Sequence, residues 1–255
     1  MKLGAQLWTV RDHCSTLEDL EDALKRIADM GYTAVQLSGV CEYQPEWMAE
    51  KLKENGLVAP ITHFPHDRIL NDTEKTIAFH KKIGAAYIGV GCIPCERNAE
   101  AIDAYIASIS PVLKKISAAG MKYMFHNHNF EFERMDNGET VLDRICAPFG
   151  TEEFGVTMDT YWVQAGGGDP AWWLRKLAGR TDCVHLKDMM YSNSDKAIRM
   201  CSVGEGNMNF DAILSACMET GVRYAFVERD ECYGDDPFDS LRRSRAYLVN
   251  RYCIK

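Results

Sequence analysis

Short apolar runs alternate along this chain with longer stretches in which apolar residues recur at helical spacing. The stretch from 17 to 30 shows the helical pattern, because Leu20, Leu24 and Ile27 fall on one face. Gly31 follows it, and glycine suits the position after a helix end. Eight runs have the length and the β-branched or aromatic content of strands, at 3–9, 33–39, 57–64, 87–92, 121–128, 154–160, 183–189 and 224–230.

The order strand, helix, glycine, strand repeats about every 30 residues, the length of a βαβ unit. Such repeats predict parallel strands joined by right-handed crossovers. Eight units favour a closed barrel, so we expect an α/β fold with a single (β/α)8 TIM barrel over residues 1–255. An open doubly wound sheet is the structural rival, but no GxGxxG motif follows the first strand.

Composition narrows the choice of partner and compartment. The chain has 255 residues and a net charge of -8, which disfavours nucleic acids and other polyanions as partners. A small neutral or metal-chelating molecule suits this charge better. No apolar run approaches the roughly 20 residues needed to span a membrane. The ten cysteines form no disulfide pattern and the amino terminus lacks a signal-peptide core, so we expect a cytoplasmic protein. A homo-oligomer is compatible with these features.

Polar residues stand where each of the last four strand-type runs ends. Asp159 closes one run, His185 and Glu228 lie in the next two, and a group at 126–132 (HNHNFEF) follows the fifth. The carboxyl ends of parallel barrel strands share one rim, so these side chains are expected to meet. A buried carboxylate needs a partner, and one divalent ion would satisfy all of them. Two carboxylates with imidazole suit Mn²⁺, Co²⁺, Mg²⁺ or Zn²⁺.

These residues resemble the xylose isomerase-like TIM-barrel superfamily of sugar and sugar-phosphate isomerases and epimerases, which includes AP endonuclease family 2. The resemblance extends over essentially the whole chain and rests on KLGAQLWTVRD, DMGYTAVQL, THF, HNHNFEF, MDT, HLKD, VGEGNMNF and VERD. It implies one divalent metal held near the ends of strands five to eight, with Asp159, His185 and Glu228 as ligands. In many members the fifth strand ends with a ligating Glu, whereas His126 stands there in this chain.

The fourth ligand therefore has two candidates. Glu131 lies five residues beyond His126 and can return to the metal if the loop is extended. We prefer Glu131, because proton-transfer catalysis favours a carboxylate with a second carboxylate opposite. His126 is the alternative, with His128 on the same face.

The expected chemistry is proton transfer beside a metal-held carbonyl, leading to isomerisation or epimerisation of a sugar or keto-sugar through an enediolate. Glu131 and Glu228 are the candidate acid and base, and Lys187 would stabilise the developing oxyanion. An ion pair of Lys187 with Asp188 or Asp159 is the structural alternative. The candidate substrate contacts are His63, His126, His128, Trp8, Trp162 and Glu205.

Three other functions stay open. Loss of a β-hydroxyl at the same site would make the protein a lyase, such as a dehydratase of a keto-sugar or keto-inositol. A metal hydrolase resembling endonuclease IV is disfavoured by the acidic charge and by too few ligands for three metals. A non-catalytic binding protein would hold metal without turnover.

Overall fold

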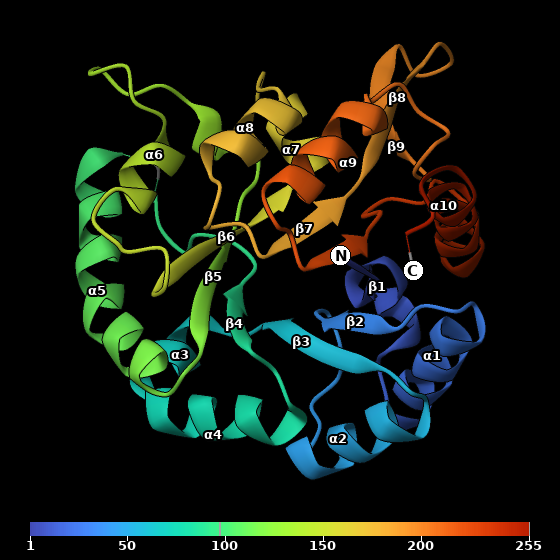
Figure 1. The fold of residues 1–255 in the computed structure, drawn as a ribbon, viewed down its shortest axis with the longest axis horizontal. Helices are drawn as coiled ribbons and strands as arrows, with labels where there is room; N and C mark the ends of the chain where they lie inside the picture. Colours follow the sequence, from blue (N-terminus) through green and yellow to red (C-terminus); the bar gives the residue numbers. More distant parts are fainter. Residues whose placement is uncertain (97, 255) are drawn as a thin grey trace.

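Eight parallel strands close into a barrel in the computed structural model, which describes residues 1–96 and 98–254. Around the barrel the order is β1-β10-β7-β6-β5-β4-β3-β2 (Figure 1). The predicted (β/α)8 TIM barrel is therefore confirmed. The barrel strands are β1 (Lys2–Gln6), β2 (Ala34–Leu37), β3 (Val58–His63), β4 (Tyr87–Val90), β5 (Lys122–His126), β6 (Phe154–Asp159), β7 (Cys183–Leu186) and β10 (Tyr224–Val227).

Helices surround the barrel on its outside, and Figure 1 shows α5 and α10 on opposite sides of it. Among the described residues, no helix is long and apolar enough to cross a membrane. The helices are α1 (Leu17–Asp29), α2 (Pro45–Glu54), α3 (His66–Asn71), α4 (Thr73–Ile83), α5 (Ala99–Ala118), α6 (Val141–Cys146), α7 (Thr160–Ala165), α8 (Pro170–Lys176), α9 (Phe210–Glu219) and α10 (Pro237–Tyr252), with 3-10 turns η1 (Leu7–His13) and η2 (Phe130–Phe132).

The first helix, α1, forms where the apolar spacing predicts it. Thr16 caps its start, accepting a hydrogen bond from the Asp19 backbone N–H at 3.1 Å. The predicted face is buried against the barrel at Leu20, Leu24 and Ile27. Gly31 follows at a φ of 91°, which glycine adopts without steric cost.

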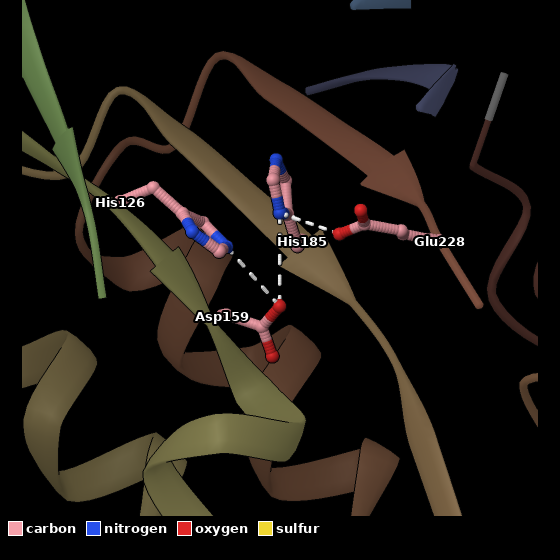
Figure 2. A group of neighbouring side chains, drawn as sticks. All are labelled: His126, Asp159, His185 and Glu228. Atoms are coloured by element: carbon pink, nitrogen blue, oxygen red, sulfur yellow. Dashed lines mark hydrogen bonds and ion pairs between the residues drawn. The ribbon is translucent and has the colours of Figure 1, made fainter. Parts of the chain in front are cut away.

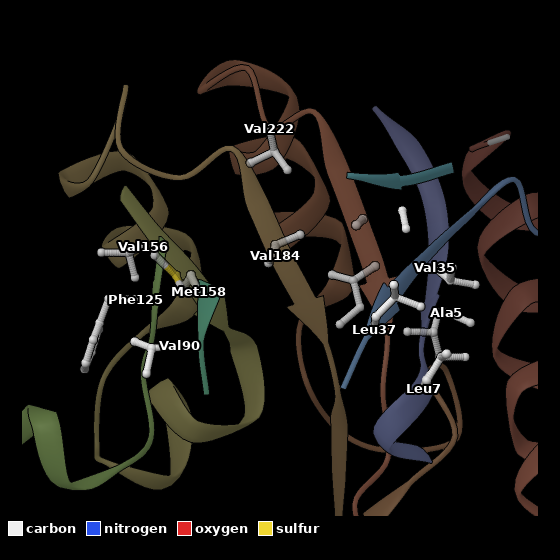
Figure 3. Close-up of a cluster of buried hydrophobic side chains, with 14 of the residues drawn as sticks. Ala5, Leu7, Val35, Leu37, Val90, Phe125, Val156, Met158, Val184 and Val222 are labelled. Atoms are coloured by element: carbon white, nitrogen blue, oxygen red, sulfur yellow. The ribbon is translucent and has the colours of Figure 1, made fainter. Parts of the chain in front are cut away.

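Side-chain alternation divides the buried residues into two layers. Outward-facing residues such as Val35, Phe125 and Val184 pack between the strands and the helices (Figure 3). Inward-facing residues fill the barrel itself, with Ile61 and Phe226 in a smaller apolar cluster. Because the alternation has a period of two, the next inward residue on each strand lies one layer closer to the carboxyl rim. That layer is polar.

All eight barrel strands end one to three residues before the predicted runs, and three of these ends affect the chain around the carboxyl rim. β1 stops at Gln6, whose side-chain Oε1 accepts the Trp8 N–H at 2.9 Å and starts η1. β5 stops at His126, and the chain enters η2 instead of an extended loop. β7 stops at Leu186, after which an antiparallel hairpin leaves the barrel, formed by β8 (Asp188–Ser192) and β9 (Ala197–Cys201). The sequence analysis did not predict this hairpin.

Candidate metal centre

Four buried side chains meet at the carboxyl ends of four consecutive barrel strands. They are His126, Asp159, His185 and Glu228, and their ligand atoms all lie within 4.8 Å of one another. Figure 2 shows the side chains converging from β5, β6, β7 and the end of β10. None of the four is more than 4% exposed, so the group is shielded from bulk water.

Strand register brings these residues to one level. Asp159 pairs with His185 across β6 and β7, and His185 pairs with Phe226 across β7 and β10. Glu228 follows two residues after Phe226, so it points inward one step closer to the rim. Its backbone N–H still donates to the Leu186 carbonyl at 3.2 Å, which holds it in line with the strand.

Hydrogen bonds orient both imidazoles toward the centre of the group. His126 Nδ1 donates to the Gly91 carbonyl at 3.0 Å, so its Nε2 faces Asp159. His185 Nε2 donates to Gln36 Oε1 at 2.6 Å, so its Nδ1 faces inward. Each ring thus uses one nitrogen as a donor to a fixed acceptor and directs the other nitrogen inward. Metal-binding histidines are held in this way.

The carboxylate oxygens of Asp159 and Glu228 that face the group lie close to the two imidazoles. Asp159 Oδ1 accepts the Trp162 N–H at 3.0 Å and caps α7. Its Oδ2 faces the group, 3.3 Å from His126 Nε2 and 3.7 Å from His185 Nδ1. Glu228 Oε2 lies 2.8 Å from His185 Nδ1. These last two atoms approach closely but have no hydrogen bond within the described residues.

This donor set fits a divalent metal. It offers two imidazole nitrogens and two carboxylate oxygens, a combination that suits Zn²⁺, Mn²⁺ or Co²⁺. Tetrahedral ligands at about 2.1 Å from an ion lie about 3.4 Å apart. The three separations given above range from 2.8 to 3.7 Å, and all four ligand atoms lie within 4.8 Å of one another. An ion would also coordinate His185 Nδ1 and Glu228 Oε2, two buried polar atoms that make no hydrogen bond within the described residues.

A lysine lies against the same carboxylates. Lys187 Nζ is 3.0 Å from Asp159 Oδ2, 3.0 Å from Glu228 Oε2 and 2.8 Å from Asp230 Oδ1. The ion pair with Asp159 that the sequence analysis kept as an alternative is therefore present. Asp188 instead accepts the backbone N–H groups of Gly204 and Gly206.

The buried charges shift several pKa values. Burial lowers the pKa of His185, but the carboxylates of Glu228 and Asp159 outweigh it and raise the pKa to about 8. Burial would raise the pKa of Asp159 and of Glu228, yet the ammonium of Lys187 holds both well below the usual range. Burial and then the charge of Glu228 raise the pKa of Asp230 to about 7.

The structure places Glu131, our preferred fourth ligand, outside the group of four within the described residues. The reason is local: β5 ends at His126, and after three residues the chain forms the 3-10 turn η2. There the Oε2 atom of Glu131 accepts the His128 backbone N–H at 2.7 Å, so this carboxylate oxygen caps the turn. His126, the alternative, lies inside the group.

Most of the predicted substrate contacts surround a pocket of about 460 Å³ above the group. Its lining includes Trp8, His63, His128, Lys187 and Glu228. Trp162 lies beside it, with its ring 5.5 Å from that of His128. Three polar atoms around this space are buried and lack a hydrogen-bond partner in the described chain, namely His63 Nε2, His128 Nδ1 and Trp162 Nε1.

Glu205 lies elsewhere. Its carboxylate pairs with Arg243 of α10 at 2.7 Å, and it is not among the residues that line the pocket. The Asp188 carboxylate holds the glycines on both sides of Glu205, so this loop is tied to the base of the hairpin.

Sequence reasoning missed two residues of the centre. Gln36 orients His185 although the two are 149 residues apart and β1 and β10 separate their strands in the barrel. Its only signal was a polar residue inside the apolar run TAVQL. Asp230 lies two residues after Glu228 and so faces the same side of the strand, but its contact with Lys187 was not predicted.

Comparisons with known proteins agree with the fold. A family model for the xylose isomerase-like TIM barrel matches residues 24–249, so the chain belongs to this family. A sugar phosphate isomerase/epimerase from Parabacteroides distasonis is similar, with a TM-score of 0.83 and 20% identity, covering 100% of this chain and 95% of that one. No curated protein matches the chain significantly.

Two further solved structures share the fold. An L-ribulose 3-epimerase has a TM-score of 0.76 and 16% identity, covering 98% of this chain and 94% of that one. An IOLI protein with a bound zinc atom has a TM-score of 0.74 and 15% identity, covering 98% and 97%.

Proposed function

We propose that this member of the xylose isomerase-like TIM-barrel family is a divalent-metal-dependent isomerase or epimerase of a sugar or keto-sugar. The observation that carries the proposal is the group of four buried donors, with both histidines oriented by hydrogen bonds to present a nitrogen to one point. The sugar phosphate isomerase/epimerase and the L-ribulose 3-epimerase among the structural relatives support the substrate class, and the zinc of the IOLI protein supports the metal.

In this proposal His126, Asp159, His185 and Glu228 hold the ion. When bound, a divalent ion there polarises a substrate carbonyl and makes the adjacent C–H more acidic. Zn²⁺, Mn²⁺ and Co²⁺ fit the two nitrogen donors better than Mg²⁺, which prefers oxygen ligands.

The residues around the ion handle the proton and the substrate. Lys187 supplies a positive charge 3.0 Å from Glu228, where a developing oxyanion is stabilised. Glu228 and Asp230 are the carboxylates placed to accept or return a proton, and Asp230 takes the role that we first gave to Glu131. His63, His128 and Trp162 present buried polar atoms without partners, and these are suited to substrate hydroxyls.

A lyase is the second candidate, and the placement of the proton-handling groups favours it. Glu228, Asp230 and Lys187 all follow the neighbouring strands β7 and β10, and Glu131 is not gathered with them. Epimerisation removes a proton from one face of a carbon and returns it to the other, so it is best served by acid and base groups on opposite sides of the substrate. Removal of a proton and loss of a β-hydroxyl from the same face need such groups on one side only.

Metal analysis and solvent exchange test the proposal together. We expect about one divalent ion per chain, since the group forms one site, and an Asp159→Ala variant should lose it. Metal-loaded protein incubated with ketoses and inososes in deuterated water should place deuterium at one carbon. A product of unchanged mass identifies an isomerase or epimerase, and loss of water identifies a lyase. A protein that holds no metal and exchanges no proton would refute both.

A further inference from the structure

A second, larger cleft lies next to the metal-centre pocket. It has a volume of about 910 Å³, against about 460 Å³ for the pocket beside the metal centre. The two spaces share Ser38, Gly39, His63, Phe64 and Pro65 in their walls. They therefore adjoin each other over the ends of β2 and β3, which are neighbours in the barrel (Figure 1).

His63 stands at the junction of the two spaces. Its ring lies 5.1 Å from the ring of His126 and 5.7 Å from that of His185, so one side of it contacts the metal centre. Its Nδ1 is 3.1 Å from Ser38 Oγ, and its buried Nε2 has no hydrogen-bond partner in the described part of the chain. His63 thus forms part of the wall between the two spaces.

Beyond His63 the larger cleft, here called the outer groove, has an aromatic wall. Phe64 follows His63 in the chain, and its ring lies 5.3 Å from that of Phe79 on α4. Phe79 in turn lies 5.5 Å from Tyr43. Leu17 lines the same groove and is 42% exposed, so apolar surface faces solvent there.

The charges of the groove argue against an anionic ligand. Arg68 contributes a guanidinium that stacks on Phe64 at 4.7 Å, but the groove is also lined by the exposed carboxylate of Glu42. A phosphate would meet both signs of charge and only one arginine. Stacked rings and aliphatic side chains instead suit an apolar ring, because aromatic faces pack on one another with little cost in conformational freedom.

We infer that the substrate is a conjugate of a keto-sugar. Its carbonyl-bearing sugar unit occupies the metal-centre pocket, while an apolar, ring-containing aglycone, joined at a carbon other than the carbonyl, lies in the outer groove against Tyr43, Phe64 and Phe79. This inference rests on the proposed function, because the sugar unit is assigned to the metal centre. Ser38 and His63 are the polar residues in the wall that the two spaces share, where the bond joining the two parts would lie.

Paired glycosides test the inference. Methyl and phenyl glycosides of glucose, galactose, mannose and xylose, in both anomers, differ only in the group that would enter the outer groove. Calorimetric titration of metal-loaded protein should show at least one sugar whose phenyl glycoside binds about tenfold or more tightly than its methyl glycoside, the gain expected from burying a phenyl ring.

Two variants locate the effect. Leu17→Trp fills the groove and Tyr43→Ala removes part of its wall. In each variant the affinity for the phenyl glycoside divided by that for the methyl glycoside should fall toward one. Met218→Trp is the matched control, because Met218 is 65% exposed on α9 and lies outside the groove lining. Metal content and thermal unfolding report whether each variant is folded.

Equal affinity for methyl and phenyl glycosides, or binding of neither, would overturn the inference. A phenyl preference that survives in folded Leu17→Trp and Tyr43→Ala proteins would overturn it as well. Failure of the proposed function looks different, because the phenyl preference would then persist in a protein that holds no metal and exchanges no proton.

Discussion

Protonation of one buried histidine outside the metal centre should weaken the fold in mild acid. His80 lies on α4, is fully buried, and joins that helix to β3. Its Nδ1 donates to the Thr76 carbonyl at 2.7 Å, and its Nε2 lies 2.8 Å from the hydroxyl of Thr62. In this arrangement Nε2 accepts the hydroxyl proton, so the ring is neutral. Burial lowers the pKa of His80 from 6.5 to about 4.

The sign of the effect follows from proton counting. Between pH 6.5 and 4 the unfolded chain protonates this imidazole and the folded chain does not, so stability falls as the pH falls through that range. Above pH 6.5 the imidazole is neutral in both the folded and the unfolded chain, so its protonation costs no stability there. A change of one in pKa is worth about 1.4 kcal/mol, so the full loss is about 3 kcal/mol and about 2 kcal/mol of it has occurred by pH 5.

Urea unfolding at pH 7.5 and pH 5, with chelator present, measures this loss. A His80→Gln variant keeps one donor and one acceptor but does not titrate. Wild type should lose about 2 kcal/mol more than His80→Gln between the two pH values. The other histidines are common to both proteins and cancel in the difference. A His13→Gln variant, changed at an exposed position, should follow wild type. Parallel losses in wild type and His80→Gln would refute the reasoning.

Three further predictions concern the metal centre. His126→Ala should lower metal affinity by at least about tenfold, whereas Glu131→Gln should leave it nearly unchanged. Titration of both variants with Zn²⁺ and Mn²⁺ measures the affinities. A large loss in Glu131→Gln and none in His126→Ala would identify Glu131 as the ligand. Gln36→Leu should cost about 10 to 100-fold in metal affinity by freeing the His185 ring, and wild-type affinity in this variant would contradict that role. Lys187→Met should bind metal at least about tenfold more tightly, because a unit charge about 4 Å away contributes about 4 kcal/mol per unit of ion charge at an effective dielectric of 20. Substrate turnover should fall in the same variant, and weaker metal binding there would show that Lys187 does not compete for Asp159 and Glu228.

Much of the fold could be predicted because the relevant signals are local. The apolar face of α1 and the glycine after it depend on residues that are neighbours in the chain. The eight strand-type runs also correspond to eight barrel strands. Asp159, His185 and Glu228 were expected to meet because parallel strands present their carboxyl ends on one rim, and this argument needs only the order of the strands.

The structure departs from the prediction where a strand end had to be placed to within one or two residues. Glu131 was given a ligand's role on the assumption that the chain stays extended after His126. The chain instead forms η2, and the backbone of His128 engages the carboxylate. A hydrogen bond of this kind depends on the turn that the chain makes, and an apolar run of residues does not specify that turn.

The orientation of the ligands is a property of the closed barrel rather than of any one strand. Gly91 follows β4 and fixes His126 of β5, while Gln36 of β2 reaches across the interior to fix His185 of β7. Neither acceptor lies near its histidine in the chain, so the donor atoms converge only after β1 and β10 have closed the barrel between β2 and β7. A preformed site of this kind is absent from the unfolded chain, so metal binding should stabilise the folded barrel. Gln36→Leu should therefore reduce the metal-induced rise in thermal unfolding temperature more than it changes the stability of the metal-free protein. A rise equal to that of wild type would show that barrel closure orients His185 without Gln36.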